Sequence, residues 1–251
     1  MIRSMIAAGA AAATLLALPA GAFDVTEMTE SERAAFRAEV RAYLLENPEV
    51  LMEAIGVLEE REQMAQIAAD AAQIETYAEA IFEDGHSWVG GNPDGDVTLV
   101  EFIDYRCSFC RRAHPEVEAL LASDGNIRLI VKEFPILGEE SMLASRFAIS
   151  VKLNEGDELY KQVHDALIEK RGAVTLDTLA AMADDLGLDV DAVMTGMLDP
   201  EIDEIINANR ALAQQLGITG TPTFILPGQM LRGYVPLDGM REIVAGVRGE
   251  G

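Results

Sequence analysis

The chain has few of the features that bind nucleic acid, build a disulfide framework or cross a membrane. Its 251 residues include two cysteines, and 19 Lys and Arg stand against 43 Asp and Glu, giving a formal net charge of −24 at pH 7. Such an acidic surface repels phosphate backbones, so nucleic acid is a poor partner. Two cysteines cannot form a framework of several disulfides. After the N-terminal region, the sequence has no apolar run long enough to span a membrane.

The first 22 residues have the pattern of a secretory signal peptide. Arg3 gives a short basic region, an Ala- and Leu-rich run follows from Ile6 to Leu18, and a small-residue cleavage site ends at Ala22. The apolar run is too short for a membrane span, and no cysteine follows the cleavage site to carry a lipid. The sequence therefore predicts a soluble protein exported to the periplasm, where disulfides can form.

The two cysteines form a Cys-X-X-Cys motif. Cys107 and Cys110 are separated by Ser108 and Phe109, and the motif follows an apolar strand pattern and begins a helical one. A cysteine at a helix N-terminus faces unpaired N–H groups and the positive end of the helix dipole, and both stabilise its thiolate. A disulfide between these cysteines would close a minimal loop and constrain the unfolded chain little. The motif therefore predicts a redox-active dithiol and disfavours a purely structural bridge.

Hydrophobic periodicity predicts an N-terminal helical segment at 23–84. Its sequence is acidic and rich in Ala, Glu and Leu, and apolar residues recur at steps of three and four from Met64 to Ile81. A lone helix of this kind is marginal in water, so this stripe must be buried, either on the chain's own domain or against another subunit. The turn-rich segment 90–95 lets the helices swing away, which favours self-association.

The rest of the chain predicts a small sheet interrupted by helices. Strands at 97–103 and 127–134 flank a helix at 107–122, and this order predicts adjacent parallel strands. A hairpin beginning at Thr223 and a final helix follow an all-helical insert at about 138–216. The predicted fold class is therefore α/β, with a helical insertion and an N-terminal helical segment.

Together these features resemble the thioredoxin fold of the DsbA type of exported thiol:disulfide oxidoreductase, with residues 85–251 as the DsbA-like domain. The sequence from Phe102 to Arg112 resembles the lead-in of the ScsC-like branch of that family. The stretch from Tyr43 to Leu51 resembles the N-terminal segment that serves oligomerisation in that branch. The resemblance implies an enzyme that oxidises or isomerises protein disulfides with no cofactor beyond its own dithiol.

The resemblance also assigns roles around the dithiol. Cys107 is the expected nucleophile, and Cys110 is the resolving thiol that releases a partner from a mixed disulfide. Pro222 matches the cis-proline loop that lies against the reactive cysteine, where Thr221 offers its backbone to a partner strand. An ordinary trans proline at the start of a strand is the alternative.

Polar and basic residues beside the motif are the expected supporting groups. The Ser108 hydroxyl and the guanidinium groups of Arg106, Arg111 and Arg112 are expected to lower the pKa of the Cys107 thiol. The alternative for the arginines is a solvated helix face.

Two further interpretations concern residues outside the motif. Glu101 matches the buried acid of the DsbA-like pattern, with Lys132 as its basic partner, and the acid would relay a proton during exchange. A structural ion pair at the sheet edge is the alternative. His114 is expected to be an exposed helix histidine, and no metal site is predicted, because structural zinc normally takes four ligands.

Two classes of function compete. A disulfide oxidase or isomerase would act on exported proteins with thiols or disulfides, would use a membrane redox partner and, as an isomerase, would form a homo-oligomer. Threonine before the proline and the N-terminal helices both resemble the isomerase side of the family. The rival is a copper or other soft-metal binding or tolerance protein that uses Cys107 and Cys110 as thiolate ligands.

Overall fold

The structure, a computed structural model, describes residues 25–249. The signal peptide predicted at 1–22 lies outside the described residues. The chain divides into two compact units, Met1–Glu59 and Glu60–Gly251, and the division falls inside the long helix α2 (Glu49–Thr76). No described helix is both long enough and apolar enough to cross a membrane.

The first unit is helical. It contains η1 (Val25–Glu27), α1 (Glu30–Glu46) and the first part of α2. Thr29 caps α1 through a capping box, in which its side chain accepts from the Glu32 N–H while the Glu32 carboxylate accepts from the Thr29 N–H. Asn47 and Pro48 separate the two helices: α1 ends just before these residues and α2 begins just after them, because proline cannot continue a preceding helix.

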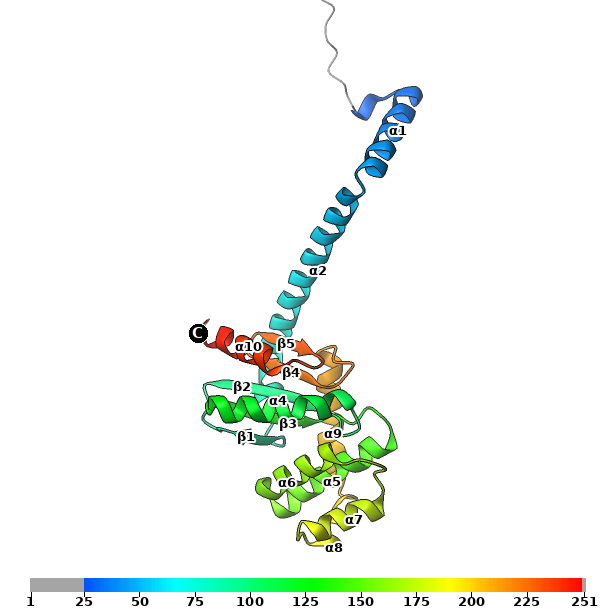
Figure 1. Cartoon of the computed structure of the whole chain (residues 1–251). Helices are drawn as coiled ribbons and strands as arrows, with labels where there is room; N and C mark the ends of the chain where they lie inside the picture. The colour runs from blue at the N-terminus through cyan, green and yellow to red at the C-terminus, as the bar shows by residue number, and fades with distance from the viewer. Residues whose placement is uncertain (1–24, 250–251) are drawn as a thin grey trace, which may run out of the picture. The chain divides into compact units, whose positions relative to one another are not determined.

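The second unit contains a five-stranded sheet and most of the helices. Its elements after α2 are α3 (Ala78–Phe82), β1 (Trp88–Gly91), β2 (Val97–Ile103), α4 (Ser108–Asp124), β3 (Ile127–Glu133), α5 (Glu139–Glu155), α6 (Asp157–Glu169), α7 (Leu176–Asp185), α8 (Val190–Gly196), α9 (Pro200–Gln215), β4 (Thr223–Leu226), β5 (Gln229–Arg232) and α10 (Leu237–Gly249). The strand order is β1-β3-β2-β4-β5, and the predicted parallel pairing of β2 with β3 is confirmed. Helices α5 to α9 form the insert predicted between the two halves (Figure 1).

The two faces of the sheet are covered by different helices. Successive residues of β2 alternate between two hydrophobic clusters, because side chains along a strand point to opposite faces. Leu99 and Ile103 join a cluster with residues of α4, α6 and α10, whereas Val100 and Phe102 join a cluster with residues of α2, α3 and α9. The sheet is therefore buried on both sides. The central strand β2 leads directly into α4, so the start of this helix is also buried.

The apolar stripe predicted from Met64 to Ile81 is divided by the fold. Tyr77 separates α2 from α3. Ile74 and Ile81 are buried against the sheet, whereas Met64 and Ile67 are 62% and 48% exposed. The C-terminal part of the stripe thus packs on the chain's own domain, which was the alternative to self-association. Residues 60–84 consequently belong to the second unit, and the domain boundary expected at 84 lies earlier, at Glu59.

An ion pair reinforces this packing. Asp70 of α2 is 4% exposed and accepts hydrogen bonds of 2.6 and 2.9 Å from the guanidinium of Arg232 at the end of β5. The hydrogen bonds from Arg232 hold the pKa of the Asp70 carboxyl below its usual value. The two-point geometry fixes the second half of α2 to the edge of the sheet.

Candidate dithiol active site

Cys107 and Cys110 lie where the central strand β2 turns into α4. Cys107 is the N-cap residue of α4, and Cys110 lies in the first turn of that helix. Both cysteines are unpaired and buried, at 7% and 1% exposure, whereas the intervening Phe109 is 55% exposed. The first sulfur therefore lies at the positive end of the helix dipole, and the second is enclosed by the core.

The turn between β2 and α4 is held by Asp104, which the sequence analysis missed. Its buried carboxylate accepts hydrogen bonds from the N–H groups of Arg106 at 2.8 Å, Ile136 at 2.8 Å and Leu137 at 3.0 Å, and from the hydroxyl of Ser141 at 2.8 Å. The Asp104 carboxylate thus joins the segment that precedes Cys107 to the loop after β3. The only sequence signal was an acidic residue directly between a buried strand and the motif.

The loop before β4 reaches the first sulfur. The Thr221–Pro222 peptide bond is cis, and Cys107 Sγ lies 3.1 Å from the Thr221 carbonyl oxygen. Strand β4 pairs antiparallel with β2, with Thr223 opposite Phe102, so the loop is fixed by the same strand that carries the motif. The sequence prediction that Thr221 and Pro222 lie beside the reactive cysteine agrees with this geometry.

The two thiols differ sharply in acidity. A hydrogen bond from the Cys110 thiol, together with the backbone N–H groups of Phe109 and Cys110, lowers the pKa of Cys107 to about 5, against the opposing effect of burial. Burial raises the pKa of Cys110 far above its ordinary value, and the hydrogen bond to Cys107 raises it further. At neutral pH Cys107 is therefore a thiolate and Cys110 a thiol.

Within residues 25–249, the side chains predicted to support the thiolate have no hydrogen bond to either sulfur. The three arginines contact other groups: Arg106 pairs with Glu140 and donates to Gly172 O, Arg111 donates to Ile168 O and Tyr105 O, and Arg112 stacks on the Tyr234 ring. Nearby carboxylate, carbonyl and aromatic groups hold these cations, and the pKa of Cys107 is lowered first by the hydrogen bond with Cys110. Ser108 is exposed, and within residues 25–249 its hydroxyl has no hydrogen bond to either sulfur.

The predicted partnership of Lys132 with Glu101 is wrong. In the parallel register Glu101 lies opposite Val131, so the side chains of Glu101 and Lys132 point to opposite faces of the sheet. The fully buried Lys132 ammonium donates to Ala80 O at 3.0 Å and pairs with the Asp84 carboxylate. Lys132 therefore anchors the segment after α3 to the sheet and takes no part in the dithiol site.

Glu101 remains a candidate proton acceptor. It is 5% exposed, and burial, followed by the negative charges of Glu118 and Cys107, raises its pKa to about 8. Its charge also raises the pKa of the resolving thiol, Cys110. A carboxyl group that titrates near neutral pH beside a thiol of high pKa suits a general base.

We expect Glu101→Gln to slow the attack of Cys110 on a mixed disulfide by about a hundredfold, because the amide cannot take the thiol proton. In the parent protein this rate should rise as the pH passes about 8, where Glu101 ionises, and the variant should lack that rise. Stopped-flow measurement of mixed-disulfide release tests this. An unchanged rate and pH profile would remove Glu101 from the mechanism.

Stability measurements provide the control. The pKa of Glu101 is higher in the folded chain than the ordinary value of 4.5, so its stabilising contribution is present at low pH and is lost as the pH rises through about 8. Glu101→Gln should remove that loss, which shows that the variant folds around a neutral side chain.

The acidity of Cys107 gives a second prediction. Its alkylation rate should follow an ionisation near pH 5, while Cys110 should stay unmodified in the native protein across the neutral range. Iodoacetamide labelling followed by peptide mass spectrometry separates the two sites, with labelling in denaturant as the control. Faster modification of Cys110 would reverse the assigned roles.

His114 is not the exposed histidine predicted from the sequence. It is half-buried between α4 and α6, with Nε2 3.2 Å from Asp165 Oδ1 and its ring 5.4 Å from that of His164. His164 is itself buried. The prediction failed because α6 belongs to the insert, and sequence spacing does not show which face of α4 it covers.

The sheet order, the dithiol at the start of α4 and the Thr-Pro loop against the first sulfur define a thioredoxin-fold thiol:disulfide oxidoreductase. Residues 98–245 match the family model described as the DSBA-like thioredoxin domain, and the chain belongs to that family. Residues 32–65 match a second model, the copper resistance protein ScsC N-terminal domain.

Solved structures agree with this assignment. A thioredoxin-like oxidoreductase from Silicibacter pomeroyi is 37% identical, with 68% of this chain and 97% of that chain covered and a TM-score of 0.65. The thiol-disulfide exchange protein alpha-DsbA2 from Wolbachia pipientis is 28% identical over 73% and 98% of the two chains, with a TM-score of 0.68. Proteus mirabilis ScsC in a transitional conformation is 26% identical over 91% and 100%, with a TM-score of 0.65.

Curated sequence relatives include much longer proteins. The Na⁺/H⁺ antiporter NhaA of Herminiimonas arsenicoxydans is 30% identical over 146 residues, which are 58% of this chain and 23% of that protein. The chain thus spans about a quarter of the length of the NhaA proteins that it matches.

Proposed function

We propose that the chain is an exported enzyme that oxidises or isomerises disulfides in other exported proteins. The difference in acidity between Cys107 and Cys110 is the observation that supports this most directly. The Cys107 thiolate attacks a substrate disulfide, forms a mixed disulfide and displaces one substrate thiolate. That thiolate then attacks a second substrate disulfide, and a later attack on the mixed disulfide returns Cys107 as a thiolate with no net change in electrons.

The same dithiol also supports oxidation. A substrate thiolate attacks the Cys107–Cys110 disulfide, and a second substrate thiolate then displaces Cys107, which leaves the substrate oxidised and the enzyme reduced. Two electrons must then pass to a redox partner, and a membrane protein facing the periplasm is the partner we propose. No further cofactor is needed for either route. Export rests on the signal-peptide pattern of residues 1–22.

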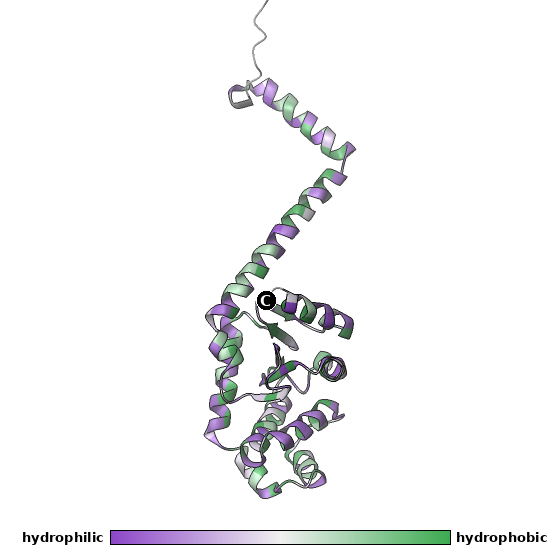
Figure 2. Ribbon diagram, turned by 90° about the vertical axis from the view of Figure 1, so that its left-hand side faces the viewer, coloured by the Kyte–Doolittle hydropathy of each residue, from purple (hydrophilic) through white to green (hydrophobic). Residues whose placement is uncertain are grey.

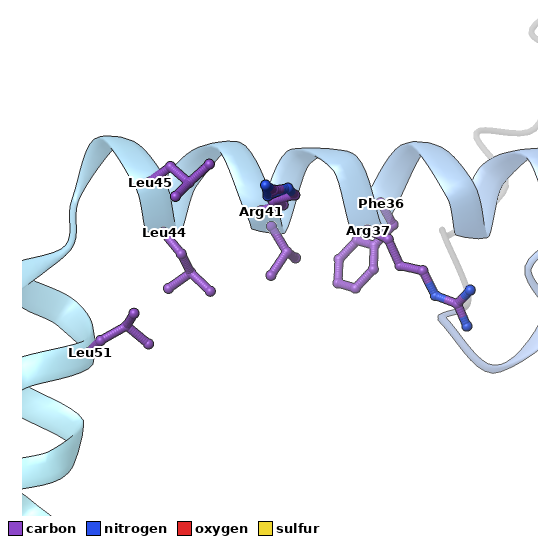
Figure 3. Close-up of a pocket in the computed structure, with 7 residues that line it drawn as sticks. Phe36, Arg37, Arg41, Leu44, Leu45 and Leu51 are labelled. Carbon is purple, nitrogen blue, oxygen red and sulfur yellow. The ribbon is translucent and has the colours of Figure 1, made fainter.

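The N-terminal unit supports the isomerase route. In α1 and the first part of α2, Phe36, Leu45 and Leu51 are 45%, 68% and 48% exposed, and α1 has no buried residue. These side chains border an apolar pocket with Leu44 (Figure 3). Figure 2 shows apolar and polar residues interspersed around both helices. Exposed apolar side chains gathered around one pocket are typical of an interaction surface, so we propose that they pair with further copies of the chain.

Thr221 provides a test of the isomerase route. A hydrogen bond with the Thr221 side chain helps to lower the pKa of Cys107. Valine has the same shape and keeps the backbone carbonyl that contacts Cys107 Sγ, but it lacks the hydroxyl. Thr221→Val is expected to raise the pKa of Cys107 and to lower isomerisation of a scrambled-disulfide substrate severalfold relative to dithiol oxidation. Both activities and the alkylation profile are measured on the same preparation. Unchanged activities and an unchanged alkylation profile would contradict a role for Thr221 in the isomerase.

Copper binding by the dithiol is the second candidate. Its support is the match to a domain named for copper resistance, and thiolates are ligands that select Cu(I). The high pKa of Cys110 opposes it, because a ligand thiol must lose its proton. Titration of the reduced protein with Cu(I) alongside the scrambled-disulfide assay separates the two: tight one-to-one binding without exchange activity would favour the copper protein.

A further inference from the structure

A second cluster of ionisable side chains lies between α4, which carries the dithiol, and α6 of the helical insert. His114 of α4 and the adjacent His164 and Asp165 of α6 each offer one ligand atom, and these atoms all lie within 4.8 Å of one another. His114 Nε2 and Asp165 Oδ1 are 3.2 Å apart. That spacing matches two ligands of one tetrahedral zinc ion, whose bonds to nitrogen and oxygen are about 2.0 to 2.2 Å.

The hydrogen bonds of His164 fix which of its nitrogens can bind a metal. Tyr105 donates its single hydroxyl proton to Glu133 Oε1 at 2.7 Å, and the same hydroxyl oxygen lies 3.2 Å from His164 Nδ1. Nδ1 must therefore carry the ring proton and donate it to Tyr105, which leaves the lone pair on Nε2. A histidine that ligates a metal usually donates its other ring N–H in this way.

The cluster has a route to solvent. His114 lines a surface pocket together with Glu118, Glu169, Arg111 and Arg171. A hydrated cation can enter there, and a retained water would supply the fourth ligand, as in open zinc sites.

Lys161 would compete with a metal ion for the Asp165 carboxylate. Its ammonium lies 2.7 and 2.6 Å from the two Asp165 oxygens and 3.2 Å from Glu118. A cation that binds Asp165 must displace Lys161, and Glu118 provides the displaced ammonium with a partner already in contact.

We propose that His114, His164 and Asp165 bind a zinc ion with water as the fourth ligand. The ion joins α4, which carries the dithiol, to α6 of the helical insert. The sequence analysis predicted no metal site, and it could not show that α6 brings the second histidine and the carboxylate to His114. The inference is independent of the proposed exchange activity.

The test uses the full mature protein in its oxidised form, so that the Cys107–Cys110 disulfide withholds both thiolates. Competition with a chromogenic chelator should show one Zn²⁺ per chain, and Co²⁺ should give the visible absorption of a tetrahedral nitrogen and oxygen site. His114→Gln and Asp165→Asn should each weaken Zn²⁺ binding at least about tenfold. His86→Gln is the matched control, since His86 lies outside the cluster, and it should leave the affinity unchanged.

Lys161→Gln distinguishes a metal site from general damage, because removing the competing cation should strengthen Zn²⁺ binding severalfold. Zn²⁺ should also raise the unfolding midpoint of the parent protein and not that of His114→Gln. Should His114→Gln fail to fold, Asp165→Asn decides the question alone. Equal affinities in the parent, Asp165→Asn and His86→Gln proteins would overturn the proposal, as would an absence of Zn²⁺ binding.

Discussion

Replacing Cys110 with serine is expected to trap substrate proteins as mixed disulfides on Cys107, whereas Cys107→Ser is expected to trap almost none. Cys107 is a thiolate at neutral pH because hydrogen bonds from Cys110 and the backbone lower its pKa to about 5. Cys110 is buried, and its pKa is raised. The attacking group is therefore Cys107, and without Cys110 the mixed disulfide loses its resolving thiol.

Non-reducing electrophoresis of alkylated extracts from cells that produce each variant measures the trapped complexes, and reduction should release them. We expect at least about tenfold more complex with Cys110→Ser than with Cys107→Ser, since the buried thiol contributes little thiolate. The double variant is the control for other routes of crosslinking. Comparable trapping by both single variants would show that the chain has no single nucleophile.

Loss of the Cys110 donor does not remove the nucleophile in this experiment. The backbone N–H groups of Phe109 and Cys110 also lower the pKa of Cys107, and they remain after the substitution. Serine at position 110 can still donate a hydrogen bond from its hydroxyl. The alkylation profile of Cys110→Ser at Cys107 reports how much of the low pKa is retained.

The elements around the dithiol were predictable because their signals are local. An apolar run with strand character ends where Cys-X-X-Cys begins, and the order of strand, helix and strand implies the parallel pairing of β2 with β3. The position of Thr221 and Pro222 beside Cys107 followed from the resemblance to the family. The first of these features depends on residues close in sequence. The second depends on a family in which Cys-X-X-Cys and a Thr-Pro loop occur together.

The contacts that the sequence analysis missed join elements far apart in the chain. Glu133 at the end of β3 is buried and accepts hydrogen bonds from Tyr105 in the turn before α4, Ser145 of α5 and Tyr160 of α6. Burial raises the pKa of its carboxyl to about 7, although all three hydroxyl groups oppose this. Sequence spacing shows that such groups exist, but their meeting point depends on how the helical insert packs on the sheet.

Lys132 shows a different reason for failure. The resemblance to the DsbA-like pattern suggested Lys132 as the basic partner of Glu101. In the observed register Lys132 lies opposite Phe102, so its side chain points to the other face of the sheet. The sequence of one strand alone does not determine the register in which it pairs with a neighbouring strand. The partner, Asp84, comes from the segment assigned to the N-terminal helices.

Removing residues 23–59 from the mature protein is expected to give a monomer that keeps dithiol exchange but loses at least about nine-tenths of its isomerase activity. The reason is that this segment carries the exposed apolar surface around Phe36 and Leu45, and an isomerase grips misfolded substrates between several sites. Light scattering gives the mass, and a scrambled-disulfide substrate with a dithiol reduction assay gives the two activities.

The end point of the deletion matters. Removing residues 23–84 would also take away Ile74, Ile81 and the Asp70 and Asp84 carboxylates, which are packed in or paired with the second unit. That longer deletion should unfold at lower denaturant, because the buried Lys132 ammonium loses its partner. If only the 23–84 deletion loses isomerase activity and the 23–59 deletion keeps it, the loss reflects damage to the second unit.

A point substitution makes the same test without shortening the chain. Leu44→Glu places a charge in the apolar pocket of the first unit and should dissociate the oligomer, whereas Glu39→Gln, exposed on the same helix and outside the pocket, should leave it intact. Both variants should keep the alkylation profile of Cys107. A parent protein that is monomeric at micromolar concentration would contradict the oligomer and leave a monomeric oxidase as the function of this dithiol.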